Sequence, residues 1–360
     1  MPLAPVAGHH EARHRLASAF SAGRLPQVMV LTGPVGVGKQ RLALWLAQLL
    51  LCERPGTEPC GACAGCRQTL ELRHPDLHWL IPIPRPKAGD PEKQIEEAGT
   101  AIGELLEERR LQPLWHRPDG MSSHSVASVR VLQRAASLTS VAGGRRVFII
   151  GDAERLVPQE SSQEAANALL KLLEEPPAGS TFVLTAVDAR HLLPTMRSRA
   201  APLRLQRLSD AEVTAFLEQS GSVPAREIPQ RVALAGGAIG AAIADDDAAG
   251  SARRAAAAFL DAALGGSGSR MQAALAQAPY AARGEFTALL DAVAETLTDA
   301  ARGALGATSR RAVPASLGRR DPESLIRAVA RVEAARESAH GNVNPQLLLA
   351  VLGEELAETL

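Results

Sequence analysis

A glycine-rich stretch near the N-terminus has the residue types and spacing of a phosphate-binding loop. Residues 33–39 read GPVGVGK, which matches G-x-x-x-x-G-K, and they lie between an apolar run and a helical pattern. Glycines let backbone N–H groups converge on a phosphate, and the lysine adds a full positive charge. The sequence therefore predicts a site for the phosphates of ATP or ADP. Its candidate residues are Gly33, Gly36, Val37, Gly38, Lys39 and Gln40.

The chemistry around this loop departs from that of a nucleotide hydrolase. A loop that holds magnesium has Ser or Thr after its lysine, whereas this chain has Gln40. The strand expected at residues 147–150 is followed by Gly151, where a metal-binding Asp would be expected. A slip of one residue would let Asp152 serve, but Ala153 would then stand where the general base belongs, and Glu154 is one residue further on. We therefore do not expect hydrolysis by this chain, and passive binding of ATP or ADP stays open.

All the cysteines of the chain lie in one short segment. They are Cys52, Cys60, Cys63 and Cys66, with the spacing C-x7-C-x2-C-x2-C. Four thiolates satisfy a tetrahedral zinc ion, and the short steps match the turns that aim paired sulfurs at one ion. Four unrelated buried thiols are the alternative, which clustering within residues 52–66 disfavours. Because protein would fill all four positions, the predicted zinc is structural.

An arginine lies after the strand expected at residues 182–186, in the segment MRSRA at residues 196–200. An arginine at this place, Arg199, is either a surface charge or an arginine finger that reaches the nucleotide of a neighbouring subunit. Sequence position alone does not separate these two roles.

Composition narrows the possible functions. The formal net charge is zero and only 3% of the residues are aromatic, so the chain has neither a general basic field nor many rings for base stacking. Only four of the 39 basic residues are lysines, and this bias weakens arginine content as a sign of nucleic-acid binding. The N-terminus lacks a signal-peptide pattern, and the longest apolar stretch is too short to span a bilayer. We therefore expect a cytoplasmic protein without a membrane partner.

Short apolar runs and helical patterns alternate in the first part of the chain. Residues 28–31, 147–150 and 182–186 are typical of buried strands. Strands that alternate with helices indicate a parallel, doubly wound sheet. Further strands are expected at residues 74–86 and 203–205, and helices at 7–24, at 41–51, at 125–139 and after a capping box at Ser161 and Glu164.

The sheet is expected to form one domain over residues 1–206. This domain would include the cysteine module at 52–66. Residues 87–123 are polar and weakly patterned, which predicts a surface insertion with one helix around residues 95–110.

The rest of the chain is predicted to be helical. A capping box at Ser209 and Glu212 begins a small helical lid over residues 207–246. The segment 245–251 reads DDDAAGS and is expected to be a linker. Residues 250–360 are alanine-rich and helical throughout, so the fold class is α/β plus all-α.

Several segments, in this order and with these gaps, resemble one known family. They are GRLPQVMVLTGPVGVGKQRLA, the cysteine module followed by HPDLHWL, AANALLKLLEEPP, and RSRAAPLRL. Together they resemble the delta-prime subunits of the bacterial DNA polymerase III clamp loader, which are AAA+ proteins. The resemblance covers residues 8–241 except the insertion, and it is weaker in the helical tail. It implies an AAA+ P-loop domain with a zinc module, a helical lid and a C-terminal helical collar that assembles a ring.

The resemblance also implies roles for individual residues and partners. The four cysteines would hold zinc. Ser198-Arg199-Ala200 stands in the place of the family's Ser-Arg-Cys motif, so Arg199 would be the finger offered to an adjacent ATPase. The implied partners are gamma/tau-type ATPases and the delta subunit, with the sliding clamp and primed DNA within the assembly. The chain would thus be a component of a DNA-directed DNA polymerase holoenzyme.

Three positions distinguish two roles within such a clamp loader. The gamma/tau ATPases have Thr after the loop lysine, Asp-Glu after the second strand and Arg in a Gly-Gly-x-x-Arg lid pattern. Here these positions hold Gln40, Gly151 and Gly240. The sequence therefore favours a delta-prime-type subunit that does not hydrolyse ATP. The alternatives are an active gamma/tau-type ATPase, which would turn over nucleotide alone, and a zinc-dependent nucleic-acid-binding module, which would bind DNA in a salt-dependent way.

Overall fold

The computed structural model describes residues 6–112, 122–141, 144–156, 163–244, 246–279, 285–306, 313–314, 316–339 and 343–360. These residues form two compact units, and the boundary between them follows Ile243. We call residues 6–243 the N-terminal unit and residues 244–360 the C-terminal unit.

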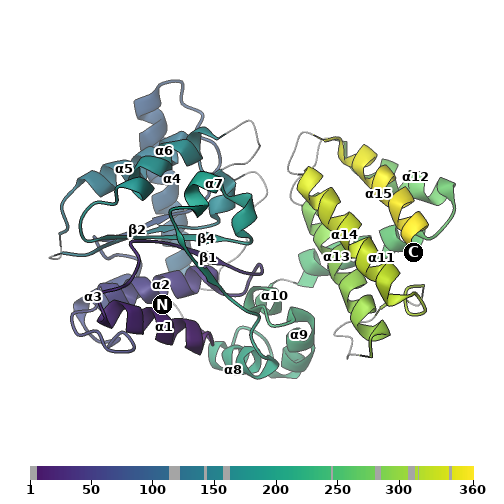
Figure 1. Ribbon diagram of the computed structural model, residues 1–360, viewed down its shortest axis with the longest axis horizontal. Coiled ribbons are helices and arrows are strands. Elements are labelled where there is room, and N and C mark those ends of the chain that lie inside the picture. The colour runs from purple at the N-terminus through teal and green to yellow at the C-terminus, as the bar shows by residue number, and fades with distance from the viewer. Residues whose placement is uncertain are drawn as a thin grey trace. The chain divides into compact units, whose positions relative to one another are not determined.

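The N-terminal unit is built on a parallel sheet of five strands, as the sequence predicts (Figure 1). The strand order is β2-β3-β4-β1-β5, and every neighbouring pair is parallel. Parallel strands covered on both faces are apolar along their length, and all five residues of β3 are buried. The strands are β1 (Val28–Thr32), β2 (Leu77–Leu80), β3 (Arg146–Ile150), β4 (Ser180–Ala186) and β5 (Ala201–Arg204).

Helices cover both faces of this sheet (Figure 1). In β1, Val28 and Val30 belong to the core on one face, and Met29 and Leu31 belong to the core on the other. This alternation follows from the two-residue period of a strand. The first core includes α4 (Pro91–Leu111), α5 (Val126–Ser137), α6 (Glu164–Glu174) and α7 (Pro194–Arg197), and the second includes α1 (His10–Ser21) and α2 (Lys39–Leu50).

The helix of the predicted surface insertion is part of the core, so that prediction is wrong for residues 91–111. Ile95, Ala98 and Ile102 of α4 are buried and belong to the same apolar cluster as Leu132 of α5. Their spacing places them on one face of a helix, but charged residues between them dilute the pattern in the sequence. Residues 113–121 of the predicted insertion lie outside the described residues.

Two predicted capping boxes have different outcomes. Ser209 and Glu212 form the expected box at the start of α8 (Asp210–Ser220), where Ser209 N–H donates to Glu212 Oε2 over 2.8 Å. Ser161 lies outside the described residues. Glu164 is the first residue of α6, so it does not hold the third helical position that a capping box requires, and that prediction is wrong.

The remaining elements of the N-terminal unit are short. Only residues 77–80 of the expected strand at 74–86 are a strand, and Ile83 pairs separately with Ser123. The lid consists of α8, α9 and α10, which share a small apolar core around Val213 and Leu217. The bounds are α3 (Ala64–Leu70), α8 (Asp210–Ser220), α9 (Ile228–Ala235) and α10 (Ile239–Ile243), with 3-10 turns η1 (Ala153–Leu156), η2 (Ala189–His191) and η3 (Ala225–Glu227).

The C-terminal unit is helical, with its own core around Phe286, Leu290 and Leu297. The predicted linker at 245–251 is wrong from residue 246 onward, because α11 begins there. Alanine favours helix, and acidic residues suit a helix N-terminus. The bounds are α11 (Asp246–Ala263), α12 (Ser267–Ala276), α13 (Glu285–Ala304), α14 (Pro322–Ala339) and α15 (Pro345–Thr359).

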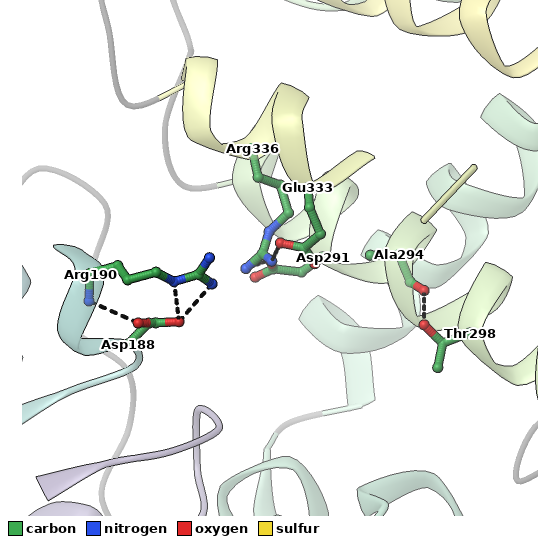
Figure 2. Close-up of polar contacts among 7 residues, drawn as sticks. All are labelled: Asp188, Arg190, Asp291, Ala294, Thr298, Glu333 and Arg336. Carbon is green, nitrogen blue, oxygen red and sulfur yellow. Dashed lines mark hydrogen bonds and ion pairs between the residues drawn. The ribbon is translucent and has the colours of Figure 1, made fainter. Parts of the chain in front are cut away.

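An ion pair joins two helices of the C-terminal unit. Arg336 of α14 contacts Asp291 of α13 at 2.6 Å and Glu333 of its own helix at 2.5 Å (Figure 2). Among the described residues, no helix has the length and apolar character needed to cross a membrane.

Candidate phosphate pocket and metal centre

The predicted phosphate loop joins β1 to α2. At Gly36 and Gly38 the φ angles are 75° and 103°, a left-handed conformation that favours glycine. Lys39 is the first residue of α2, and its side chain is buried. Its Nζ donates to the carbonyl oxygens of Gly33 at 2.8 Å and Pro34 at 2.9 Å. The ammonium group therefore lies folded onto the loop whose phosphate it would bind.

The two departures from the hydrolase pattern lie in contact with each other. A Cβ atom on Gly151 would lie 3.1 Å from Nε2 of Gln40, closer than most real contacts of this kind. A larger residue at position 151 would therefore require Gln40 to move. Long-range packing thus links Gln40 and Gly151, which the sequence presents as separate losses.

Two carboxylates follow β3 and reach the pocket. Asp152 adopts φ 49°, and its backbone N–H donates to Thr185 Oγ1 of β4 at 3.0 Å. The next carboxylate, Glu154, accepts from the backbone N–H of Val187 at 3.4 Å, and its Oε2 has no hydrogen-bond partner among the described residues. Burial, together with the neighbouring Asp152 charge, raises the pKa of Glu154 to about 7. The structure thus brings together both acidic residues that the sequence left in doubt.

These groups line one cavity of about 140 Å³. One part of its lining is apolar and comes from the N-terminal segment and the lid. The backbone of Gly240 approaches the loop closely, and its N–H donates to Gly36 O at 2.9 Å. A Cβ atom on Gly240 would lie 2.7 Å from Gly36 Cα, so this approach needs glycine. The apolar lining includes Val6, Ala7, Val35, Phe216, Ile239 and Ile243.

The structure adds one pocket residue that sequence reasoning missed. Arg109, near the end of α4, donates from Nη1 to Gln40 Oε1 at 3.3 Å. Its guanidinium carbon lies 4.4 Å from the centre of the Trp79 ring. Burial lowers the pKa of Arg109 to about 10, and the charge of Asp152 partly opposes this shift. No local motif marks this arginine, because 69 residues separate it from its partner Gln40.

The four predicted metal ligands converge in space. Their Sγ atoms all lie within 4.8 Å of one another. The Cys60–Cys66 and Cys52–Cys63 sulfur pairs are each 3.9 Å apart. Zinc–sulfur bonds of about 2.3 Å in a tetrahedron require sulfur pairs about 3.8 Å apart. The residues present therefore fit a zinc ion with four thiolate ligands.

Backbone groups shape this cysteine cluster. The N–H groups of Arg54 and Cys60 both donate to Cys52 Sγ at 3.4 Å, which favours a thiolate there. Cys63 is the N-cap of α3, and its Sγ accepts from the N–H of Cys66 at 3.4 Å. At Gly65 a Cβ atom would lie 2.1 Å from the carbonyl oxygen of Leu51, so only glycine allows this helix to approach α2.

Arg199 lies away from the pocket, in the connection between α7 and β5. Its exposed side chain pairs with Glu174 at 2.8 Å and donates to Thr195 O at 2.7 Å. The phosphate loop follows the C-terminal end of β1, whereas Arg199 precedes the N-terminal end of the parallel neighbour β5. These two edges are about 13 Å apart for strands of four residues. Another arginine, Arg190, is held by Asp188 through three hydrogen bonds (Figure 2).

A parallel sheet in this strand order, with a phosphate loop after β1 and a helical lid, defines an AAA+ P-loop fold. The family is more specific. Residues 8–209 match the family described as DNA polymerase III, delta subunit, and the chain belongs to this family of clamp-loader subunits. The resemblance that the sequence motifs indicate is thereby confirmed.

Individual relatives include more than one kind of subunit. DNA polymerase III subunit delta' of Bacillus subtilis is 28% identical over 54% of this chain and 46% of its own length. DNA polymerase III subunit tau of Salmonella typhimurium is 29% identical over 60% of this chain and 27% of its own length. A solved gamma subunit-related protein of Thermotoga maritima aligns over 98% of this chain and 99% of its own, with 14% identity and a TM-score of 0.34. The match to the delta' relative spans about half of that protein's length.

Proposed function

We propose that this chain is a delta-prime-type clamp-loader subunit that does not hydrolyse ATP and donates Arg199 to the active site of a neighbouring ATPase subunit. It would assemble with gamma/tau-type ATPases and the delta subunit, and help to load the sliding clamp on primed DNA. Residues 250–360 would form the collar that holds the ring together. The chain would act in the cytoplasm as one component of the polymerase holoenzyme.

The position of Arg199 carries this proposal. Arg199 lies at the N-terminal ends of the parallel strands, whereas the chain's own phosphate loop lies at their C-terminal ends. The arginine is therefore badly placed to act on nucleotide in its own pocket. Its exposed side chain is held by Glu174, a partner that a nucleotide phosphate on another subunit could replace. An arginine finger stabilises the charge that develops on a transferring phosphoryl group.

The pocket supports the second half of the proposal. Gln40 lacks the hydroxyl that would bind magnesium, and its amide lies against Gly151, where a metal-binding carboxylate would otherwise stand. Any ATP or ADP held there would lack the loop hydroxyl and the carboxylate at position 151 that would otherwise position magnesium. The zinc that we assign to the four cysteines has no open ligand position and would supply structural stability alone.

The test is the ATPase rate of the reconstituted ring. Replacing Arg199 with Ala should lower turnover at the one active site that it completes by about 10³-fold or more, the scale on which arginine fingers act, and the ring rate should fall by at least the share of that site. Arg197→Ala is the matched control, because Arg197 is also exposed and lies two residues earlier, at the end of α7. Equal rates for the Arg199→Ala ring and the unchanged ring would contradict the proposal.

An active ATPase of the gamma/tau type is the second candidate. One observation favours it: Asp152 and Glu154 both line the pocket that contains Lys39. Nucleotide turnover by the isolated chain, abolished by Lys39→Ala, would establish this candidate. An isolated chain that does not hydrolyse ATP, together with the loss of ring turnover on Arg199→Ala, would exclude this candidate.

A further inference from the structure

The charged part of the pocket carries more positive than negative side chains. Its lining includes the basic residues Lys39, Arg41, Arg109 and Arg155 and the acidic residues Asp152 and Glu154. Burial lowers the pKa of Arg41 and of Arg109 to about 10 each, which means that the protein environment disfavours their charged forms. A bound anion would offset this cost.

One of these cations, Arg109, lies beside the residue that replaces the magnesium-binding hydroxyl. Arg109 Nη1 contacts Gln40, the residue that replaces the magnesium-binding hydroxyl. Trp79 lies under the guanidinium group, which restricts where that group can move. The Gln40 amide also fills the space beside Gly151. The pocket therefore offers a fixed guanidinium and little room for a hydrated metal ion.

We propose that Arg109 takes over the charge-neutralising role of magnesium, so that this pocket binds a nucleoside diphosphate or triphosphate without a divalent metal. The inference rests on the proposed function, in which the pocket holds nucleotide without hydrolysing it. Guanidinium suits this role because its planar N–H groups match phosphate oxygens. Lys39 would exchange the carbonyl oxygens of Gly33 and Pro34 for phosphate oxygens.

The other part of the pocket fits the rest of such a ligand. Phe216 and Ile239 of the lid and Val6 of the N-terminal segment provide an apolar lining suited to a base. The cavity is smaller than the range of about 300–1,000 Å³ that small-molecule sites occupy. Entry of a nucleotide therefore requires the lid to shift, while Trp79 keeps the Arg109 guanidinium in place.

The direct test is the binding of ADP to the isolated full-length chain, measured by isothermal titration. The zinc-loaded protein is used in buffer without divalent ions and without chelator, because a chelator would also remove zinc. The titration is repeated with Mg²⁺ in excess over nucleotide. We expect ADP to bind in the metal-free buffer and its affinity to change by less than about threefold when Mg²⁺ is added.

Variants of α4 identify the residue responsible. Arg109→Ala should weaken metal-free ADP binding by about 10- to 100-fold, because a charged hydrogen-bond donor is removed. Arg109→Lys keeps the charge and should retain part of the affinity. Arg110→Ala is the matched control, since Arg110 is the next residue, pairs with Glu107 and does not line the pocket.

Two results would overturn this inference. One is ADP binding by the unchanged chain that requires Mg²⁺. The other is an absence of ADP binding by the unchanged chain. If ADP then binds only to the Arg109→Ala variant, this arginine blocks the pocket instead. Neither result involves turnover, so both are distinguishable from failure of the proposed function, which ATP hydrolysis by the isolated chain would reveal.

Discussion

At the scale of single residues, Glu58 links the candidate metal site to a tryptophan. It lies in the loop between Cys52 and Cys60, and its Oε2 accepts from Trp45 Nε1 at 2.7 Å. Its other carboxylate oxygen pairs with Arg13 of α1. The conformation of the loop between Cys52 and Cys60 is thus coupled to a tryptophan of α2, so a change in this loop should alter the surroundings of that indole.

We predict about one zinc ion per chain, with most of it lost in Cys63→Ser, because a tetrahedral site that loses one of four thiolates binds weakly. Elemental analysis of the purified protein measures the content. Chelation should also shift the tryptophan emission, and this shift should disappear in Trp45→Phe. A wild-type chain that folds identically without zinc would contradict a structural role.

Buried polar groups near the pocket show what a linear pattern does not reveal. His124 is buried, and burial lowers its pKa to about 4, so its imidazole is neutral at neutral pH. Its Nε2 contacts the carbonyl oxygen of Gly151 at 2.7 Å and holds the turn after β3. Like Arg109, His124 comes from a distant segment, so no sequence motif around Gly151 predicts this contact.

At the scale of elements, contact between the lid and the phosphate loop depends on two glycines. Gly240 in α10 and Gly36 in the loop approach so closely that either Cβ would lie less than 3.0 Å from the other backbone. We predict that Gly240→Ala destabilises the N-terminal unit by about 1–3 kcal/mol, the usual cost of overpacking. Urea unfolding measures the difference.

Gly103→Ala in α4 is the control for this prediction. That glycine is also helical, and a Cβ atom there would meet no other atom within 4 Å. Alanine should therefore stabilise this position by about 0.5–1 kcal/mol through helix propensity. Similar effects of the two substitutions would show that α10 moves away from the loop at little cost.

Local signals explain which elements could be predicted from the sequence. The strands, the phosphate loop and the cysteine spacing are read from consecutive residues, and the structure confirms the parallel sheet. The helix predicted around residues 95–110 is present as α4, but the sequence places it on the surface because charged neighbours dilute the apolar pattern of Ile95, Ala98 and Ile102. The contact of Arg109 with Gln40 depends on the packing of α4 against the sheet, and a single sequence carries no local pattern for such a contact.

At the scale of the whole molecule, the N-terminal unit and the C-terminal unit have separate cores. The core of the C-terminal unit is formed by its own helices, with Phe286, Leu290 and Leu297 fully or almost fully buried. Its length falls within the range of independently folding domains, about 50–250 residues. The Arg336–Asp291 ion pair also lies within it, and among the described residues this apolar cluster includes none from the N-terminal unit.

We therefore predict that residues 244–360, produced alone, fold into a helical domain with a cooperative thermal transition. Circular dichroism measures this transition, and Leu290→Ala should lower its stability by about 2–5 kcal/mol, as expected for truncation of a buried leucine. If this unit is the collar, an excess of it should also compete with the full chain and lower ATP turnover of the reconstituted ring. A folded domain that leaves ring turnover unchanged would argue against collar-driven assembly, whereas a domain that does not fold would show that its core depends on the sheet-based unit.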